Sequence, residues 1–441
     1  MVTTAQWRRL GRRSLFVAAA TASALVLAAC SGGGAPAGEG ADPQKLEYLV
    51  NAENGNIPPV LESMASGVCE AENEALPLEI NSIPQADLDG QIQLLVGQDA
   101  LPAMFAAGGT PAEGAKLWNA GKLVDFDESL EELGVLDQIE PGAISTIKAL
   151  YGGAFSFLPF QYNIEGIFYN KQMFADHGFE EPKTWDELLE VAEALKADGV
   201  LPFTASGEQG WPITRLLSGY IFRSLGPDAL RKVADGEAKL TDPEYVEAAA
   251  AIADLGAKGY LNENIASLDY DGAQNEFLEG NAAMFYMGTW ALTAINDPEG
   301  NKIGADNVGF MPFPAVDGGA GDIGQYPSNV GLPSTFGSAT YGPKVQSWVK
   351  CITENFGEMS LVEQNTISGF KVPDEVWAEQ PQLTQDVHER ISGSTESVLW
   401  FEALFNAKAG QDSSKNVSLL VTGQMSPEEF MGLLQTDLDA G

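Results

Sequence analysis

The sequence predicts an α/β protein of two lobes, each consisting of a sheet flanked by helices. The chain has 441 residues, and domains of roughly 100 to 200 residues make two of them the expected number. Apolar residues make up 44% of the chain, which is enough to form a sizeable core in each lobe. Short apolar strands alternate with amphipathic helices in the first part of the body, as is typical of a parallel sheet covered by helices.

The first lobe begins with three short strands separated by two helices. We expect strands at 45–51, 78–83 and 103–107, and helices at 58–73 and 87–97. Ligands of such sheets bind beyond the carboxyl ends of the strands. In this chain those ends carry the polar segments 51–54 and 108–110.

The second lobe begins with an apolar and aromatic stretch, 158–169, that suits a buried strand. Thr184 and Glu187 then have the spacing of a capping box, which predicts the start of an amphipathic helix. Further strands are expected at 201–206, 282–287, 308–314 and 326–333, and a helix at 397–407. We expect the chain to cross between lobes near 157–162, near 310–330 and near 390, which would make a clamshell with a hinge.

The N-terminus has the features of a secretory signal. Four arginines (Arg8, Arg9, Arg12 and Arg13) precede an apolar stretch that is too short to span a membrane. Leu27-Ala-Ala-Cys30 resembles a bacterial lipobox, in which the cysteine is acylated and becomes the first mature residue. We therefore predict a signal peptide at 1–29 and a flexible Gly/Ala/Pro-rich tether at 30–44. Ordinary cleavage near Ala29 or a signal anchor is the alternative, and Arg12-Arg13 leaves open Sec or twin-arginine export.

Charge and motifs exclude several classes of function. The formal net charge of −38 disfavours binding to nucleic acid, which requires Lys and Arg to replace counterions. The chain has two histidines, and His388-Glu389 lacks the second histidine of a zinc motif. We therefore expect no enzyme activity, no cofactor and no metal site, although paired carboxylates of a glycosidase are not excluded by counting.

Three segments of the body resemble a known family. Gly166-Ile-Phe-Tyr-Asn-Lys-Gln-Met-Phe174, Phe277-Leu-Glu-Gly-Asn-Ala-Ala-Met-Phe-Tyr-Met-Gly-Thr-Trp290 and Val308-Gly-Phe-Met-Pro-Phe-Pro314 are similar to segments of the family 1 extracellular solute-binding proteins of ABC importers, which include maltose-binding proteins. The resemblance implies a two-lobe, periplasmic-binding-protein-like clamshell. It also implies lobe I at 45–157 plus 325–390 and lobe II at 158–324 plus 391–441.

The resemblance implies a function as well. We expect an extracellular lipoprotein, anchored to the outer face of the cell membrane, that captures a carbohydrate and delivers it to an ABC permease. The ligand is expected to be a di- or oligosaccharide and the protein a monomer. A secreted carbohydrate-active enzyme and a binding lipoprotein for a non-sugar solute stay open as alternatives.

Sugar sites combine aromatic platforms with polar side chains at loop positions. The resemblance places a stacking aromatic residue at Trp290, with packing as the alternative. Tyr162 and Trp211 fit either the site or the core, and Glu53 and Asn54 fit either sugar contacts or a helix-capping turn. The complete set of candidate ligand-binding residues is Glu53, Asn54, Thr110, Tyr162, Trp211, Trp290, Asn329, Gly331 and Phe370.

Two further features follow from the resemblance. It places Cys69 and Cys351 in helices of the same lobe, where they could form a disulfide or remain as two buried thiols. Many members of the family carry an acidic residue near the end of the third strand, whereas this chain has Phe105-Ala-Ala-Gly-Gly-Thr110 there. The sequence therefore does not identify the sugar.

Overall fold

The computed structural model describes residues 40–108, 111–331, 333–394 and 396–440. The first sheet has the strand order β2-β1-β3-β9. Its strands are β1 (Leu46–Asn51), β2 (Leu78–Ile83), β3 (Met104–Ala106) and β9 (Ser334–Phe336). The first three are parallel and β9 is antiparallel to β3, which confirms the β-α-β-α-β alternation expected from the sequence.

The second sheet has the strand order β10-β8-β4-β6-β5, and β7 pairs with β4 outside this path. Its strands are β4 (Asn163–Asn170), β5 (Leu201–Thr204), β6 (Ala282–Gly288), β7 (Val308–Met311), β8 (Gln325–Asn329) and β10 (Glu396–Val398). Strand β4 is antiparallel to β6 and β8, whereas β5 is parallel to β6 and β10 is parallel to β8. Four strands, β5, β6, β8 and β10, therefore end at the same edge of the sheet.

Helices surround both sheets. Those up to residue 150 are α1 (Ile57–Ala65), α2 (Glu70–Ala75), α3 (Gln85–Gly97), α4 (Pro111–Asn119), α5 (Phe126–Leu133), η1 (Leu136–Gln138) and α6 (Pro141–Leu150). Those between β4 and β8 are α7 (Lys171–His177), α8 (Trp185–Ala197), α9 (Trp211–Leu225), α10 (Ala229–Ala234), α11 (Pro243–Ala257), η2 (Ile265–Ser267), α12 (Tyr270–Leu278), η3 (Thr289–Ala291), α13 (Leu292–Asn296) and η4 (Ala305–Asn307). The remainder are η5 (Ser338–Thr340), α14 (Pro343–Gln364), α15 (Asp374–Trp377), α16 (Gln382–Ser392), α17 (Phe401–Leu404), α18 (Ala407–Val421) and α19 (Pro427–Ala440).

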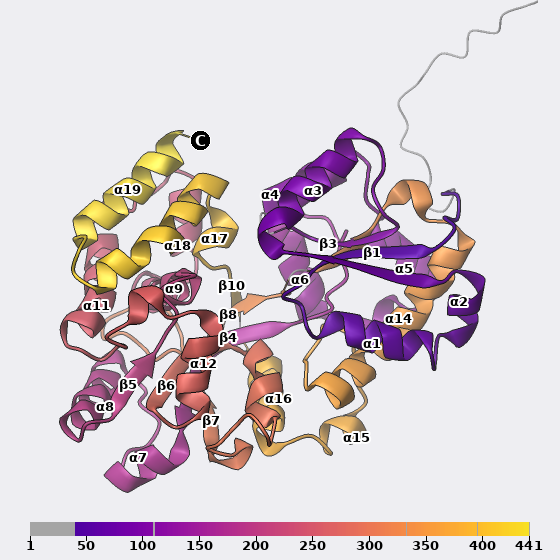
Figure 1. The fold of residues 1–441 in the computed structure, drawn as a ribbon. Coiled ribbons are helices and arrows are strands. Elements are labelled where there is room, and N and C mark those ends of the chain that lie inside the picture. The colour runs from indigo at the N-terminus through magenta and orange to yellow at the C-terminus, as the bar shows by residue number, and fades with distance from the viewer. Residues whose placement is uncertain (1–39, 109–110, 332, 395, 441) are drawn as a thin grey trace, which may run out of the picture. The chain divides into compact units, whose positions relative to one another are not determined.

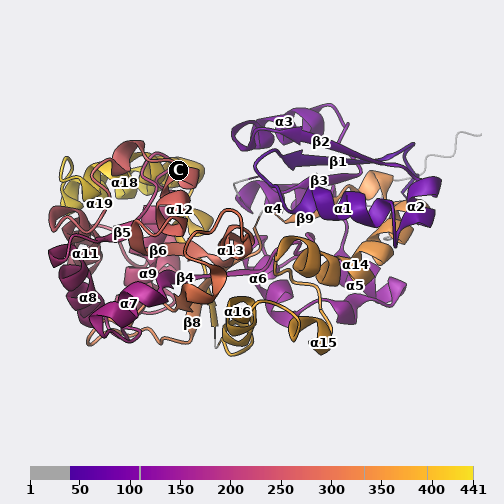
Figure 2. The same cartoon turned by 60° about the horizontal axis from the view of Figure 1, so that its bottom comes forward.

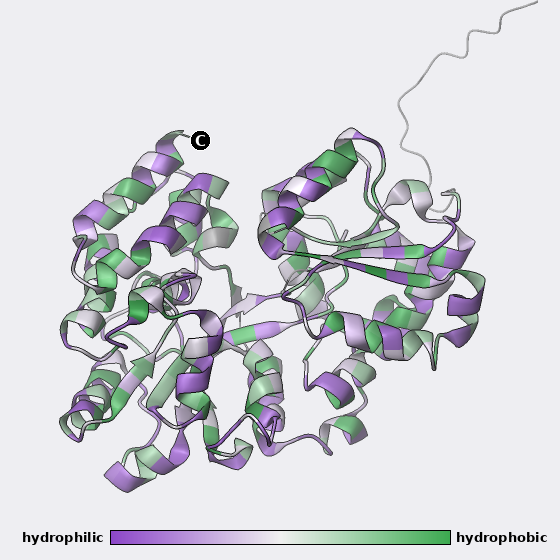
Figure 3. Ribbon diagram, viewed as in Figure 1, coloured by the Kyte–Doolittle hydropathy of each residue, from purple (hydrophilic) through white to green (hydrophobic). Residues whose placement is uncertain are grey.

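Each sheet has its own hydrophobic core. In the first sheet, β1 and β3 lie between α3 on one side and α1 and α14 on the other (Figures 1 and 2). The second sheet is covered on both faces, because one buried cluster gathers around α8, α9 and α11 and another around α12, α13 and α16. Most helices carry apolar residues on one side and polar residues on the other, as expected of helices with one buried face (Figure 3). Among the described residues, no helix has the length and hydropathy to cross a membrane.

Two features differ from the sequence prediction. The segment 325–390 was assigned to lobe I, but β8 pairs with β4 in the second sheet, where Asn163 lies opposite Asn329. At the other end of that segment, α16 packs against a face of the second sheet through Leu383 and Val387. The helix predicted at 397–407 begins instead as β10, because Ser397 and Val398 pair with β8 and add an edge strand to the second sheet.

Candidate functional site

Aromatic side chains gather beyond the edge where β5, β6, β8 and β10 end. Trp211 is the first residue of α9, Trp290 lies in η3, which follows β6 directly, and Trp400 lies two residues after the end of β10. The ring centroids of Trp211 and Trp290 are 5.9 Å apart. Tyr270, the first residue of α12, lies 6.0 Å from Trp211 with nearly parallel rings. We refer to Trp211, Tyr270, Trp290 and Trp400 as the aromatic cluster.

The position of Trp290 depends on a glycine. Gly288 ends β6, and a Cβ atom added there would lie 1.9 Å from Cζ3 of the Trp290 ring. The indole therefore lies against the backbone of Gly288. Any larger residue at this position would displace the ring.

The guanidinium of Arg215 lies among three indoles of the cluster. Its Cζ atom is 4.9 Å from the ring centroid of Trp211, 5.8 Å from that of Trp290 and 4.7 Å from that of Trp400. Arg215 follows Trp211 by four residues, so both side chains project from the same face of α9. Cations are attracted to the faces of indole rings, and this attraction orients the guanidinium within the cluster.

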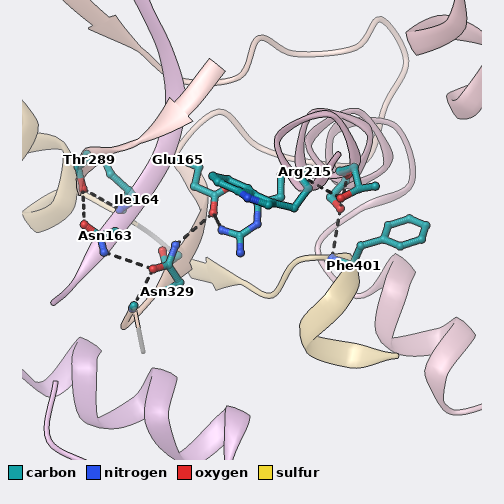
Figure 4. A network of polar contacts seen from close by, with 12 residues as sticks. Asn163, Ile164, Glu165, Arg215, Thr289, Asn329 and Phe401 are labelled. Carbon is teal, nitrogen blue, oxygen red and sulfur yellow. Dashed lines mark hydrogen bonds and ion pairs between the residues drawn. The ribbon is translucent and has the colours of Figure 1, made fainter. Parts of the chain in front are cut away.

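Glu165 of β4 is the ion-pair partner of Arg215 (Figure 4). The side chain of Glu165 is 1% exposed and that of Arg215 is 16% exposed. The carboxylate also accepts hydrogen bonds from Nδ2 of Asn329 at 3.1 Å and from the hydroxyl of Tyr286 at 3.4 Å. Burial raises the pKa of Tyr286 well above its ordinary value, and the Glu165 carboxylate raises it further, so the phenol stays protonated and donates.

These contacts define what the site can bind. Trp211 and Trp290 are partly exposed and Trp400 is 8% exposed. The exposed parts of these rings offer platforms for weakly apolar C–H groups, and the surrounding polar groups can bond hydroxyls. The Glu165 and Arg215 charges compensate each other, so the pair adds no net charge to the site. The arrangement suits a neutral, polyhydroxylated ligand.

Three of the residues predicted from the sequence come together here. Trp211 and Trp290 belong to the aromatic cluster, and Asn329 is a buried partner of Glu165. Asn329 therefore contributes to the site through its hydrogen bond to Glu165. Its side chain is 3% exposed.

Glu53 and Asn54 lie in the turn after β1. Oδ1 of Asn54 accepts from the backbone N–H groups of Asn56 at 3.2 Å and Ile57 at 3.1 Å, at the start of α1. Oε2 of Glu53 accepts from the backbone N–H of Gln85 at 2.9 Å. Asn54 thus has the helix-capping contacts that were the alternative to a sugar contact.

The other predicted residues lie outside the aromatic cluster. Gly331 has a φ of +63°, lies against Gln161, and donates its backbone N–H to Oδ1 of Asn329. Phe370 is 2% exposed and packs with Phe160 and Phe356 in the core of the first sheet, and it also lines the cavity at Tyr162 that is described below. Thr110 and Cys30 lie outside the described residues.

Tyr162 lies at a separate cavity of about 610 Å³, which also contains the stacked rings of Trp377 and His388, 3.7 Å apart. The Tyr162 hydroxyl is 3.5 Å from Oγ of Ser397. A second cavity, of about 300 Å³, lies between α3 and α4 and is mainly apolar, with Ile92 and Leu117 in its lining. Neither of these two cavities includes the aromatic cluster.

Cys69 and Cys351 are joined by a disulfide, with their Cα atoms 6.0 Å apart. Cys69 immediately precedes α2 and Cys351 lies within α14. The bond joins the start of α2 to α14, a helix that packs in the core of the first sheet.

Sequence reasoning missed Glu165, Arg215, Tyr270 and Trp400. One local signal was available, since Trp211 and Arg215 have the spacing of neighbours on a helix face. Trp400 was missed because the strand that precedes it was predicted as helix. The pairing of Glu165 with Arg215 joins residues fifty positions apart, and no local pattern indicates it.

Comparison with known proteins gives a family match. The sequence model described as "Bacterial extracellular solute-binding protein" matches residues 69–342. The "Multiple sugar-binding protein" of Streptococcus mutans is 30% identical over 181 residues, which are 38% of this chain and 41% of that protein. A "Probable sugar-binding periplasmic protein" of Brucella suis is 26% identical over 309 residues, or 67% of this chain and 69% of that protein.

Solved structures match over more of the chain. A protein described as "Chitin oligosaccharide binding protein" has a TM-score of 0.76 and 26% identity, and the match covers 90% of this chain and all of that one. By sequence, the matches to the curated relatives are shorter. In four of them, the matched segment covers between 33% and 53% of the relative's own length.

Proposed function

Because the chain belongs to the bacterial extracellular solute-binding proteins, we propose that it is the carbohydrate receptor of an ABC importer. It captures a neutral di- or oligosaccharide and delivers it to the permease in the membrane, without chemical change. The observation that carries this proposal is the aromatic cluster, with three indoles around a charge-compensated arginine. The relatives from Streptococcus mutans and Brucella suis are described as sugar-binding proteins, and the similar structure as a chitin oligosaccharide binding protein, which agrees with a sugar ligand.

In this proposal, Trp290 and Trp400 stack on the C–H faces of the sugar rings, and polar groups around them bond the hydroxyls. Asn51 is a candidate partner at the carboxyl end of β1. Its side chain is 4% exposed, and its Oδ1 atom has no hydrogen-bond partner among the described residues. A sugar hydroxyl at Asn51 would satisfy this buried acceptor.

The two sheets give the receptor its two lobes, with ligand contacts from both. A ligand favours the closed arrangement only by the additional contacts that it makes there. The permease would then recognise the closed, loaded form.

Export and anchoring are a further part of the proposal. The signal at 1–29 directs export, and lipid on Cys30 holds the receptor at the outer face of the membrane. Mass spectrometry of the mature N-terminus tests this directly. We expect an acylated Cys30, and a Cys30→Ser variant that is released into the medium; an unmodified N-terminus elsewhere would contradict the anchor.

Binding is tested by tryptophan fluorescence and thermal shift of the full chain against a panel of mono-, di- and oligosaccharides. A ligand that binds only the folded state raises Tm by mass action. We expect a saturable shift with one sugar class, lost in Trp290→Ala and retained in Trp118→Ala, a tryptophan of α4 outside the cluster. Sugar recovered unchanged supports a receptor, whereas a hydrolysed product would indicate a carbohydrate-active enzyme, and no shift would direct the search to other solutes.

A further inference from the structure

A buried chain of polar contacts connects the aromatic cluster to the segments that pass between the two sheets. Asn163 is the first residue of β4 and Asn329 is the last residue of β8, and the two lie opposite each other. Just before β4, Leu158 forms a bridge to Ser334 of β9 in the first sheet. Just after β8, the chain continues into β9 itself. Asn163 and Asn329 therefore lie at the points where the segment before β4 and the segment after β8 connect the second sheet to the first.

The side chain of Asn329 uses both ends of its amide. Nδ2 donates to Oε1 of Glu165 at 3.1 Å, and Oδ1 accepts from the backbone N–H of Gly331 at 2.9 Å. Oδ1 also accepts from Nδ2 of Asn163 at 3.3 Å. One buried amide thus joins the partner of Arg215 to the backbone of the crossing segment (Figure 4).

The backbone conformation and surroundings of Gly331 leave little room for any other residue. Its φ of +63° lies in the left-handed region that favours glycine. A Cβ atom there would lie 2.1 Å from Oε1 of Gln161, in the segment that precedes β4. The Asn329 side chain thus accepts its hydrogen bond from the backbone of the residue that makes this left-handed turn.

Helix α9 is also hydrogen-bonded to the segment that follows β10. Oγ of Ser218 accepts from the backbone N–H of Phe401 at 3.2 Å, and Phe401 follows Trp400 directly. Ser218 lies three residues after Arg215 on α9. The helix that carries Arg215 is therefore bonded to a second stretch of chain next to the aromatic cluster.

We propose that Asn329 is a positioning residue that couples the environment of Arg215 to the left-handed turn at Gly331, through the carboxylate of Glu165. In a buried network each hydrogen bond is strengthened by low dielectric, and a change at one member alters the others. A ligand that contacts Arg215 alters how strongly it holds Glu165, and Asn329 transmits this change to the crossing segment. The role of the ligand rests on the proposed function, whereas the coupling between Arg215 and Gly331 does not.

Hydrogen exchange of the full chain, measured by mass spectrometry at the Gly331 amide, tests the coupling without ligand. The test variant combines Arg215→Met with Glu165→Gln, so that no charge is left buried alone. We expect exchange at Gly331 to be about tenfold faster, as for the loss of one hydrogen bond. Asn329→Ala should give at least this increase, because it removes the acceptor itself.

Asn301→Ala is the matched control. Asn301 is also a buried asparagine, 4% exposed, and its side chain bonds the backbone at Ile295, Ile303 and Gly304, none of which lies in a crossing segment. It should leave exchange at Gly331 unchanged. If the double variant does not fold, Arg215→Lys replaces it, with a smaller increase expected.

The coupling is overturned if Asn329→Ala speeds exchange at Gly331 but the Arg215 variants do not. In a second experiment, hydrogen exchange at the Gly331 amide is measured in the presence of the sugar that binds. We expect sugar to slow exchange at Gly331 in the wild type but not in Asn329→Ala, and equal protection in both would also overturn the proposal. If no sugar binds, the proposed function fails while the ligand-free arm still decides the coupling.

Discussion

The buried carboxylate of Glu165 is paired with the guanidinium of Arg215 at the centre of a cluster of indole rings. The pair links the central strand β4 to the start of α9, and each of these elements ends or begins near the aromatic cluster. The geometry of the cluster therefore depends on an ion pair that the second sheet holds in place.

Replacing Glu165 with Ala should lower the free energy of unfolding by about 3 to 5 kcal/mol, because it leaves the guanidinium without its carboxylate in a mostly buried position. Urea unfolding measures the change. Glu79→Ala is the matched control, because its ion pair with Lys45 is about half exposed. Such exposed pairs contribute only about 0 to 1 kcal/mol, and a loss at Glu165 no larger than at Glu79 would contradict this account of the pair.

Gly288→Ala should weaken sugar binding, because the added methyl group overlaps the ring of Trp290. We expect an affinity about tenfold lower, the scale of one lost aromatic contact, together with a shift in tryptophan emission. Gly432→Ala in α19 is the control, since a Cβ there meets nothing within 4 Å. It should retain affinity and stabilise its helix; unchanged binding in Gly288→Ala would show that the position of the Trp290 ring is not important for the site.

Reduction of the Cys69–Cys351 bond should lower Tm. The bond closes a loop with a sequence separation of 282, and loss of a native disulfide usually costs about 2 to 5 kcal/mol. The Cys69→Ser/Cys351→Ser variant should have the lower Tm with and without reductant. If reductant lowers the Tm of that variant as well, the effect does not arise from this disulfide.

His388 should make stability depend on pH. Burial lowers the pKa of His388 from its ordinary value near 6.5, while Asp374 and Glu389 oppose this shift. The unfolded chain therefore binds a proton more readily than the folded one, so the stabilising contribution is present above the ordinary pKa and is lost as the pH falls below it. Thermal unfolding between neutral pH and about pH 5.5 should show a smaller loss of Tm for His388→Gln than for the wild type; equal losses would assign the pH dependence to other groups.

Local patterns predicted much of the fold. The capping box at Thr184 is present, with Oγ1 accepting from the backbone N–H of Glu187 and the Glu187 carboxylate accepting from that of Thr184. These contacts depend only on residues three positions apart, so sequence spacing is sufficient to indicate them. The strand at Leu78–Ile83 was predicted with its observed bounds from the alternation of its side chains, which is also a local pattern.

Long-range pairing was not predictable in this way. The helix expected at 58–73 is interrupted between α1 and α2, next to Cys69, whose partner is far away in the sequence. β8 was placed in the wrong lobe because its pairing with β4 is set by contacts between distant segments. The same limit explains the site, where Trp290 was identified from a family motif but Arg215 and Trp400 come together only in the folded chain.

The central claim is that the aromatic cluster binds a sugar, and calorimetric titration of the full chain and of Trp400→Ala with the best sugar of the panel tests it most directly. Trp400 is the indole closest to the Arg215 guanidinium, at 4.7 Å, and its ring is part of the proposed platform. We expect one sugar bound per chain, with an affinity reduced about tenfold or more in Trp400→Ala. Saturable binding that is equally strong in the variant would place the sugar elsewhere and contradict the account.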